Sequence, residues 1–208
     1  MADAVFISGL FKLQKICYNI SIENTTRRCG MKAWHHFRTI TKHRHKVIAH
    51  CAKCGILWQG LFHDLSKYSL TEFIPGAKFY LGTRSPNEAE RDAQGYSLAW
   101  MHHKGRNRHH FEYWQDYNRK TKRMEPVKMP ARFVAEMFCD RVAASKIYQG
   151  KNYKPESSLI YFQNSNARKN GMFHPETEKK LGELLAVLAE NGEAAAFSAV
   201  RELVKNGY

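Results

Sequence analysis

Apolar side chains recur at intervals of three and four residues along most of the chain, and alternating strand-like runs bounded by turn residues are nearly absent. This periodicity predicts an all-α fold in which each helix buries one face. A first long helix is predicted over residues 31–54. Much of its apolar stripe comes from five residues: Trp34, Phe37, Ile40, Val47 and Ile48.

Turn and capping residues divide the rest of the chain. Gly55 and Gly60 bracket a break, after which residues 61–65 are predicted to begin a short buried helix. Ser85, Pro86 and Glu88 have the spacing of a helix start, and that helix is predicted to bury Tyr96, Ala99 and Trp100 and to end near Gly105. Further helices are predicted over 130–150, 175–190 and 193–205, and the last two are expected to support the fold.

The length of 208 residues favours one domain. Residues 1–30 match the helical pattern poorly, so we predict a loosely packed extension there and a single domain over 31–208. Five cysteines, an odd number without regular pairing, fit a reducing compartment such as the cytoplasm. The apolar run near the start is short and interrupted by lysines, so neither a signal peptide nor a membrane span is expected.

Histidines carry the first chemical signal, because eleven are present and most of them cluster. Imidazoles gathered with carboxylates suit a transition-metal site. The sharpest segment is His63-Asp64, followed by Lys67; on a helix Lys67 would share the face of His63 and could approach a phosphate. An ordinary ion pair at a helix end is the alternative. Cys51 and Cys54 form a CxxC without a second thiol pair, and we expect two half-buried helix cysteines there.

The ordered set His43, His63-Asp64 and Asp140 resembles the HD-domain superfamily of metal-dependent phosphohydrolases, over a core of about residues 42–146. Residues 63–73 and 100–114 also look like an uncharacterised bacterial family of small HD-like proteins. The resemblance implies an HD-like helical bundle with supporting C-terminal helices. It also implies one or two divalent transition-metal ions, namely Mn, Fe, Zn, Co or Ni.

The resemblance extends to further ligands between His-Asp and the final Asp. Two histidine pairs lie in that interval, and which member of each pair binds stays open: His102, His103, His109 and His110. His45 and His50 compete with His43 as the first ligand.

The implied reaction is hydrolysis of a phosphate ester, such as a nucleotide or a related small anion, by a metal-activated water. Asp64 would bind or bridge the metal, Lys67 would neutralise phosphate, and His102 or His110 could relay a proton if it is not a ligand. Glu72 could orient the water, or it could be a solvated carboxylate.

Charge points to an anionic partner, because 33 Lys and Arg stand against 19 Asp and Glu and the net charge is +14. Substrate contacts are expected from Lys67 and from four residues at the start of a dense basic stretch: Lys104, Arg106, Asn107 and Arg108. Aromatic residues in that stretch could stack on a base or pack in the core. They are Phe111, Tyr113, Trp114 and Tyr117.

Two other functions fit the same residues. Some HD-fold proteins with similar ligands use two irons for oxygen-dependent oxidation, and metal identity would separate that chemistry from hydrolysis. A nucleic-acid-binding protein with structural histidines is the second, and its affinity would fall steeply with salt. The oligomeric state is not readable from these patterns.

Overall fold

The structure is a computed structural model that describes residues 30–208, and helices make up nearly all of its architecture. The all-α prediction is confirmed. The extension predicted over 1–30 lies outside the described residues except for Gly30, which is helical. The first helix is described over residues 30–53 and is called helix 30–53 below. The other elements follow in chain order: α2 (Leu57–Phe62), η1 (Leu65–Tyr68), α3 (Leu70–Lys78), α4 (Pro86–Gln94), α5 (Leu98–Lys104), η2 (Phe111–Tyr113), β1 (Gln115–Asn118), β2 (Arg123–Pro126), α6 (Ala131–Gln149), η3 (Gly150–Asn152), α7 (Ser157–Asn164), α8 (Asn166–Lys169) and α9 (Pro175–Asn206).

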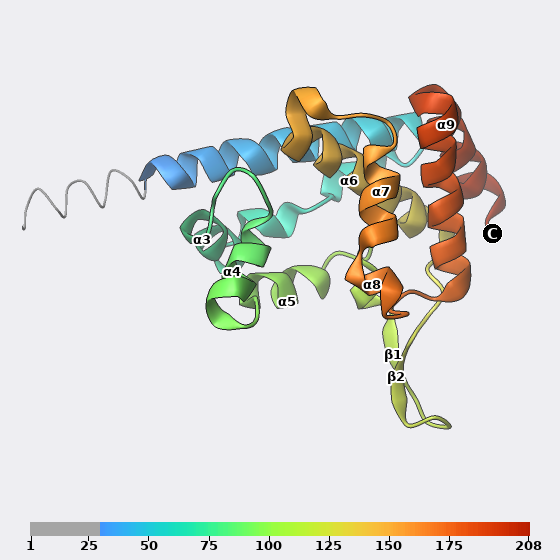
Figure 1. Cartoon of the computed structure of the whole chain (residues 1–208), viewed down its shortest axis with the longest axis horizontal. Coiled ribbons are helices and arrows are strands. Elements are labelled where there is room, and N and C mark those ends of the chain that lie inside the picture. Colours follow the sequence, from blue (N-terminus) through green and yellow to red (C-terminus); the bar gives the residue numbers. More distant parts are fainter. Residues whose placement is uncertain (1–29) are drawn as a thin grey trace, which may run out of the picture.

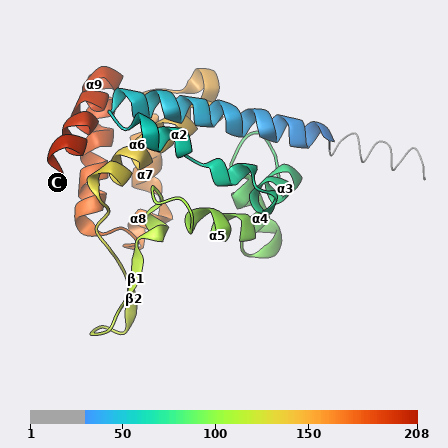
Figure 2. The same ribbon diagram turned by 180° about the vertical axis from the view of Figure 1, so that it is seen from behind.

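Helix α6 is at the centre of the core. It packs against α7 and α9, and Figures 1 and 2 show helix 30–53 with α2 on its other side. Pro130 precedes α6 and Gly150 ends it with a positive φ of 54°, as the sequence predicts. The two C-terminal helices are also confirmed, because a kink at Gly192, with φ of 79°, divides α9 into two helical halves. Helices α7 and α9 thus form a layer against one side of α6.

Helix 30–53 buries only part of the predicted apolar stripe. Ile40 and Val47 are buried, whereas Trp34 and Phe37 are exposed and stack on each other with ring centroids 5.8 Å apart. The N-terminal half of the helix extends past the core and has the α3 region alongside it, where Thr39 contacts the hydroxyl of Tyr80 at 2.8 Å. The prediction that both aromatic residues face the core is therefore wrong.

The chain breaks more often than predicted on the way to the histidines. Gly60 lies inside α2, and Phe62 and Leu65 are exposed, so the predicted buried helix over 61–65 is wrong. A turn at residues 63–64 separates α2 from η1. The helix predicted from Ser85 onward is two helices, because Gly95 ends α4 with φ of 80°. Tyr96 falls in the break between them and is exposed, so the prediction that it faces inward is wrong. The hydroxyl of Ser97 then caps α5 by accepting the backbone N–H of Trp100 at 3.0 Å.

The β1–β2 hairpin projects from the helical body (Figures 1 and 2). Its strands pair antiparallel from Gln115 opposite Pro126 to Asn118 opposite Arg123. At its base the Gln115 amide donates to the carbonyl of Met172 at 2.8 Å. None of the described helices has the length and apolar character needed to cross a membrane.

Gly60 allows α2 to pack directly on helix 30–53. A Cβ at this position would lie 2.6 Å from the Cβ of buried Cys51. We predict that Gly60→Ala destabilises the protein by about 1–3 kcal/mol, because neither backbone can move apart without opening the core. Thermal and urea unfolding measure this change. Gly105→Ala is the matched control, since its Cβ would meet only ordinary contacts, and equal stability of the two variants would contradict the prediction.

Candidate metal centre

Asp64 lies in the turn between α2 and η1 and is only 2% exposed. Its backbone is left-handed, with φ of 54°, a conformation that few residue types other than glycine adopt and that Asp tolerates. Arg44 on helix 30–53 fixes the turn, because its guanidinium donates to the carbonyls of Leu61 and of His63, the latter at 3.2 Å. The His63-Asp64 pair therefore comes from a braced turn and not from a helix as predicted.

One group of four donors gathers around Asp64 from three elements of the chain. It consists of His43, His63, Asp64 and Asp140. The Nε2 of His43 lies 2.9 Å from Oδ1 of Asp140. The Nε2 of His63 lies 3.3 Å from Oδ2 of Asp64 and 3.6 Å from Oδ1 of Asp140. These are the four residues of the ordered pattern, and the fold brings all of them together.

A second group shares the same aspartate and adds three histidines: His103, His109 and His110. The Nε2 atoms of His103 and His109 lie 3.2 Å and 3.5 Å from Oδ1 of Asp64. The Nε2 of His110 lies 2.9 Å from that of His103. Asp64 thus presents one oxygen to each group, the arrangement expected of a carboxylate between two cation positions.

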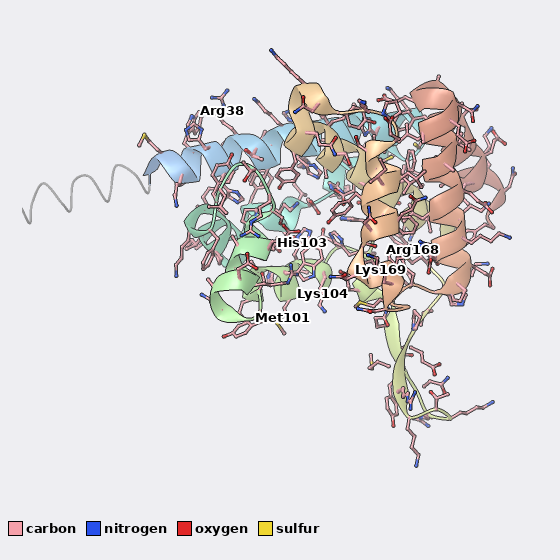
Figure 3. The ribbon with its side chains drawn as sticks, in the orientation of Figure 1. Arg38, Met101, His103, Lys104, Arg168 and Lys169 are labelled. Atoms are coloured by element: carbon pink, nitrogen blue, oxygen red, sulfur yellow. The ribbon has the colours of Figure 1, made fainter. Side chains whose placement is uncertain are left out.

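Two buried glutamates fix the orientation of these imidazoles. Oε1 of Glu136 accepts Nδ1–H from both His63 and His109, at 2.8 Å and 3.1 Å. Oε2 of Glu72 accepts Nδ1–H from His103 at 2.7 Å. Each bond places a proton on Nδ1 and turns Nε2 inward, the orientation that metal-ligating histidines require. Figure 3 labels His103 and the exposed Met101 on opposite sides of α5.

The inward-facing atoms lack hydrogen bonds of good geometry. Charged neighbours approach these buried atoms, but none makes a hydrogen bond of good geometry with them. The atoms are Nε2 of His43, His63 and His109 and both carboxylate oxygens of Asp64. Buried polar atoms normally have partners, because leaving one without a partner costs about 1–3 kcal/mol. Converging lone pairs of imidazole and carboxylate fit a divalent transition metal, so the donor set passes this chemical test.

Electrostatics keep the carboxyl groups ionised. Burial would raise the pKa of Asp64, but His63, Lys67 and His103 hold it well below its ordinary value. Burial would also raise the pKa of Asp140, but His43 and His63 outweigh this effect and hold the pKa well below its usual range. Hydrogen bonds from His109 and His63 lower the pKa of Glu136 to about 2 despite burial.

The pKa values of the histidines shift in opposite directions, depending on the groups around each imidazole. Burial would lower the pKa of His63, but Asp64, Asp140 and Glu136 raise it well above its ordinary value. Burial lowers the pKa of His43, and burial together with His109 and His103 lowers that of His110 well below its usual range. The cluster therefore balances its negative charge with protons, and a bound cation would displace some of them.

Several predicted candidates lie outside both groups. His102 points its Nδ1 to Oε1 of Glu72 at 2.6 Å and keeps a side chain 19% exposed, whereas its neighbour His103 lies inside. His45 is exposed on helix 30–53, and His50 donates through Nδ1 to the carbonyl of Cys139 at 3.2 Å. The structure thus separates His43 from its two competitors and His103 from His102.

The residues predicted to contact substrate lie in different places. Lys67 lies at the centre, with its Nζ 2.6 Å from Oδ2 of Asp64 and its side chain 29% exposed. Lys104 is half-buried, and Arg106 and Arg108 are exposed on the segment beyond α5. Asn107 is buried and donates to the hydroxyl of Ser66 and to the carbonyl of His103, each at 2.8 Å. Its amide is therefore engaged in holding the loop, in place of the predicted substrate contact.

Glu136 and Arg44 are functional candidates that the sequence patterns did not single out. Glu136 precedes Asp140 by four residues and so lies on the same face of α6. A carboxylate in an otherwise apolar buried stretch was the available signal. Glu72 was singled out, but it is buried and orients His103, so the alternative of a solvated carboxylate is wrong.

A family model described as "Family of unknown function (DUF5662)" matches residues 32–187. The chain belongs to this family. The match runs from helix 30–53 into α9 and includes every residue of the two donor groups. Comparison with curated proteins and with solved structures gave no match. Membership of the DUF5662 family therefore brings no activity with it, and the site must be interpreted from its own geometry.

Asp64→Asn should abolish metal retention. Asparagine keeps the volume and tolerates the left-handed backbone, but it removes the charge that both donor groups share. Elemental analysis after reconstitution with Mn, Fe, Zn, Co or Ni measures the bound ion in the wild-type protein and the variant. His45→Ala is the control, because His45 is exposed two residues from His43 and should leave the metal content unchanged. Full retention by Asp64→Asn would refute the site.

Glu136→Gln should weaken metal binding by about 10–100-fold, because one amide oxygen cannot replace both carboxylate oxygens toward His63, His109 and Gln59. Competition between the protein and a chromophoric chelator for Zn²⁺ measures the affinity, and circular dichroism checks the fold. Glu183→Gln, on the surface of α9, serves as the control. Unchanged affinity in Glu136→Gln would show that the glutamate does not orient the ligands.

Proposed function

We propose that this member of the DUF5662 family is a metal-dependent phosphohydrolase of the HD type. The observation that supports it best is the pair of donor groups that share Asp64, with the ammonium of Lys67 beside them. Imidazole and carboxylate donors favour Mn, Fe, Zn, Co or Ni over Mg or Ca. When bound there, one or two such ions supply a water nucleophile at neutral pH and neutralise charge on a phosphoryl oxygen.

The residues of the chain have distinct tasks in this proposal. Burial would lower the pKa of Lys67, but Asp64 and Asp140 raise it, so its ammonium stays charged and available to a phosphate oxygen. His110 keeps a neutral imidazole, because burial, His109 and His103 lower its pKa, so it suits a metal ligand better than the proton relay expected of it. Glu72 holds His103 and His102 by their Nδ1 atoms. Its role is therefore to position imidazoles, with His102 at the solvent side.

A nucleotide is the favoured small substrate. The ring of Trp100 contacts that of His110 with centroids 4.7 Å apart, and the guanidinium of Arg91 lies 5.5 Å from the Trp100 ring. An aromatic ring and a cation beside the donor groups provide a surface for a base and an anion. A reducing compartment such as the cytoplasm fits the three buried free thiols within residues 30–208, which are Cys51, Cys54 and Cys139.

Phosphate release from nucleotides should depend on restoring a transition metal to chelator-treated protein. Lys67→Met should lower kcat by about 10²-fold or more with the metal content unchanged, because the charge beside the phosphoryl group is lost. Lys78→Met, exposed at the end of α3, is the control. A panel of nucleotides and sugar phosphates, followed by malachite-green detection, measures the reaction. Iron-dependent oxygen uptake without phosphate release would replace hydrolysis by oxidation.

A further inference from the structure

The β1–β2 hairpin is anchored only at its base. Its strands pair with each other and with no other strand in the described residues. The base is fixed where Val127 N–H donates to the carbonyl of Trp114 at 2.9 Å and where the Trp114 ring packs on Phe133. A two-stranded ribbon of this kind is marginal by itself, because one hairpin buries little apolar area. The hairpin projects from the helical body (Figure 1), so packing in the core does not account for its position.

The far end of the hairpin is strongly basic. Four exposed cations lie within five residues of one another: Arg119, Lys120, Lys122 and Arg123. None of the four forms an ion pair with a carboxylate of residues 30–208. The carboxylate of Glu125 instead accepts from Asn118 at 2.6 Å and from Thr121 at 2.5 Å, and Asp116 accepts the backbone N–H of Tyr117 at 2.8 Å. The hairpin's own acids thus leave these charges available to a polyanion.

Aromatic groups accompany the cations on the outer surface. Tyr117 and Met124 are cross-strand partners, 54% and 62% exposed, and so form an uncovered apolar pair. Before the hairpin, the guanidinium of Arg108 lies 5.6 Å from the ring of Tyr113. Phe111 is buried and Trp114 packs on the core, so the predicted base-stacking role passes to the two tyrosines. Exposed aromatics among cations are typical of surfaces that bind single strands.

The hairpin is continuous with the metal centre. His109 and His110 are followed directly by η2, and β1 begins at Gln115. β1 is about 13 Å long at 3.3 Å per residue. A polyanion that lies along the hairpin would therefore lead toward the two donor groups.

We propose that the β1–β2 hairpin is an arm that binds single-stranded nucleic acid and directs it to the metal centre. The cations contact phosphates, and Tyr117 and Tyr113 stack on bases that are free only in a single strand. This inference rests on the proposed phosphohydrolase function and names its substrate class as an oligonucleotide.

Binding is tested on the full chain without metal, in the presence of EDTA, so that the outcome does not depend on hydrolysis. Fluorescence anisotropy follows a labelled oligothymidylate of about 12 nucleotides at a series of salt concentrations. The test variant combines Arg119→Ser, Lys120→Ser and Lys122→Asn; asparagine suits the left-handed φ of 55° at residue 122. Its affinity should fall at least tenfold at low salt, and the slope of log affinity against log salt should become shallower by about 2.

A matched control removes three charges from the exposed face of helix 30–53 by Arg38→Gln, Lys42→Gln and Lys46→Gln. This variant should bind like the wild type. Tyr117→Ala should lower affinity about tenfold with an unchanged salt slope, since it removes stacking without removing charge. Both triple variants should keep the wild-type unfolding temperature.

Three results would overturn the proposal. Equal weakening in the two triple variants would assign binding to net charge alone. Hairpin-dependent binding to phosphatidylserine vesicles, without binding to the oligonucleotide, would assign the arm to a membrane surface. If oligonucleotide binding fails while phosphate release from mononucleotides persists, the arm is refuted and the hydrolase stands; the reverse outcome refutes only the hydrolase.

Discussion

The buried charge of Asp64 is the constraint on which the arrangement of the centre depends. An ionised carboxylate cannot be buried without partners, since its desolvation costs several kcal/mol. The chain supplies those partners from separate elements: His63 beside it, Lys67 on η1, His103 on α5 and His109 after it. Helix 30–53 contributes Arg44, which holds the turn from the backbone side. Elements far apart in sequence therefore meet at one residue.

Helix α6 positions two further carboxylates of the centre. Asp140 and Glu136 lie on its inward face, whereas Phe138 and Val142 are fully buried. The position of one helix therefore fixes a candidate ligand, Asp140, and the acceptor of two imidazole protons, Glu136. Cys54 and Cys139 pack between helix 30–53 and α6 with sulfur atoms 3.6 Å apart. Cys51 and Cys54 are fully buried, not half-buried as expected, and with Cys139 they contribute packing behind the donor groups.

The resemblance to the ordered pattern of the HD-domain superfamily predicted the donor set, and local chemistry did not. His43, His63, Asp64 and Asp140 stand in that order along the chain, and the fold brings them together. The choice of His103 over His102 depends on where α5 begins, and this start is set by Gly95 and the Ser97 cap. Periodicity shows which side of helix 30–53 is apolar but not how far the core extends along it. Trp34 and Phe37 were therefore misassigned.

The centre and the surface around it carry charges of opposite sign. The chain is strongly basic, yet its buried centre gathers four carboxylates: Asp64, Glu72, Glu136 and Asp140. Alone, these groups would repel a phosphate, because Coulomb repulsion is weakly screened in a buried site. Divalent cations between Asp64 and the imidazoles would reverse the sign of the local potential, while basic side chains outside attract the anion. The acidic interior and the basic exterior are thus compatible parts of a single arrangement: under the proposed function, the first would bind the metal and the second would attract the anionic substrate.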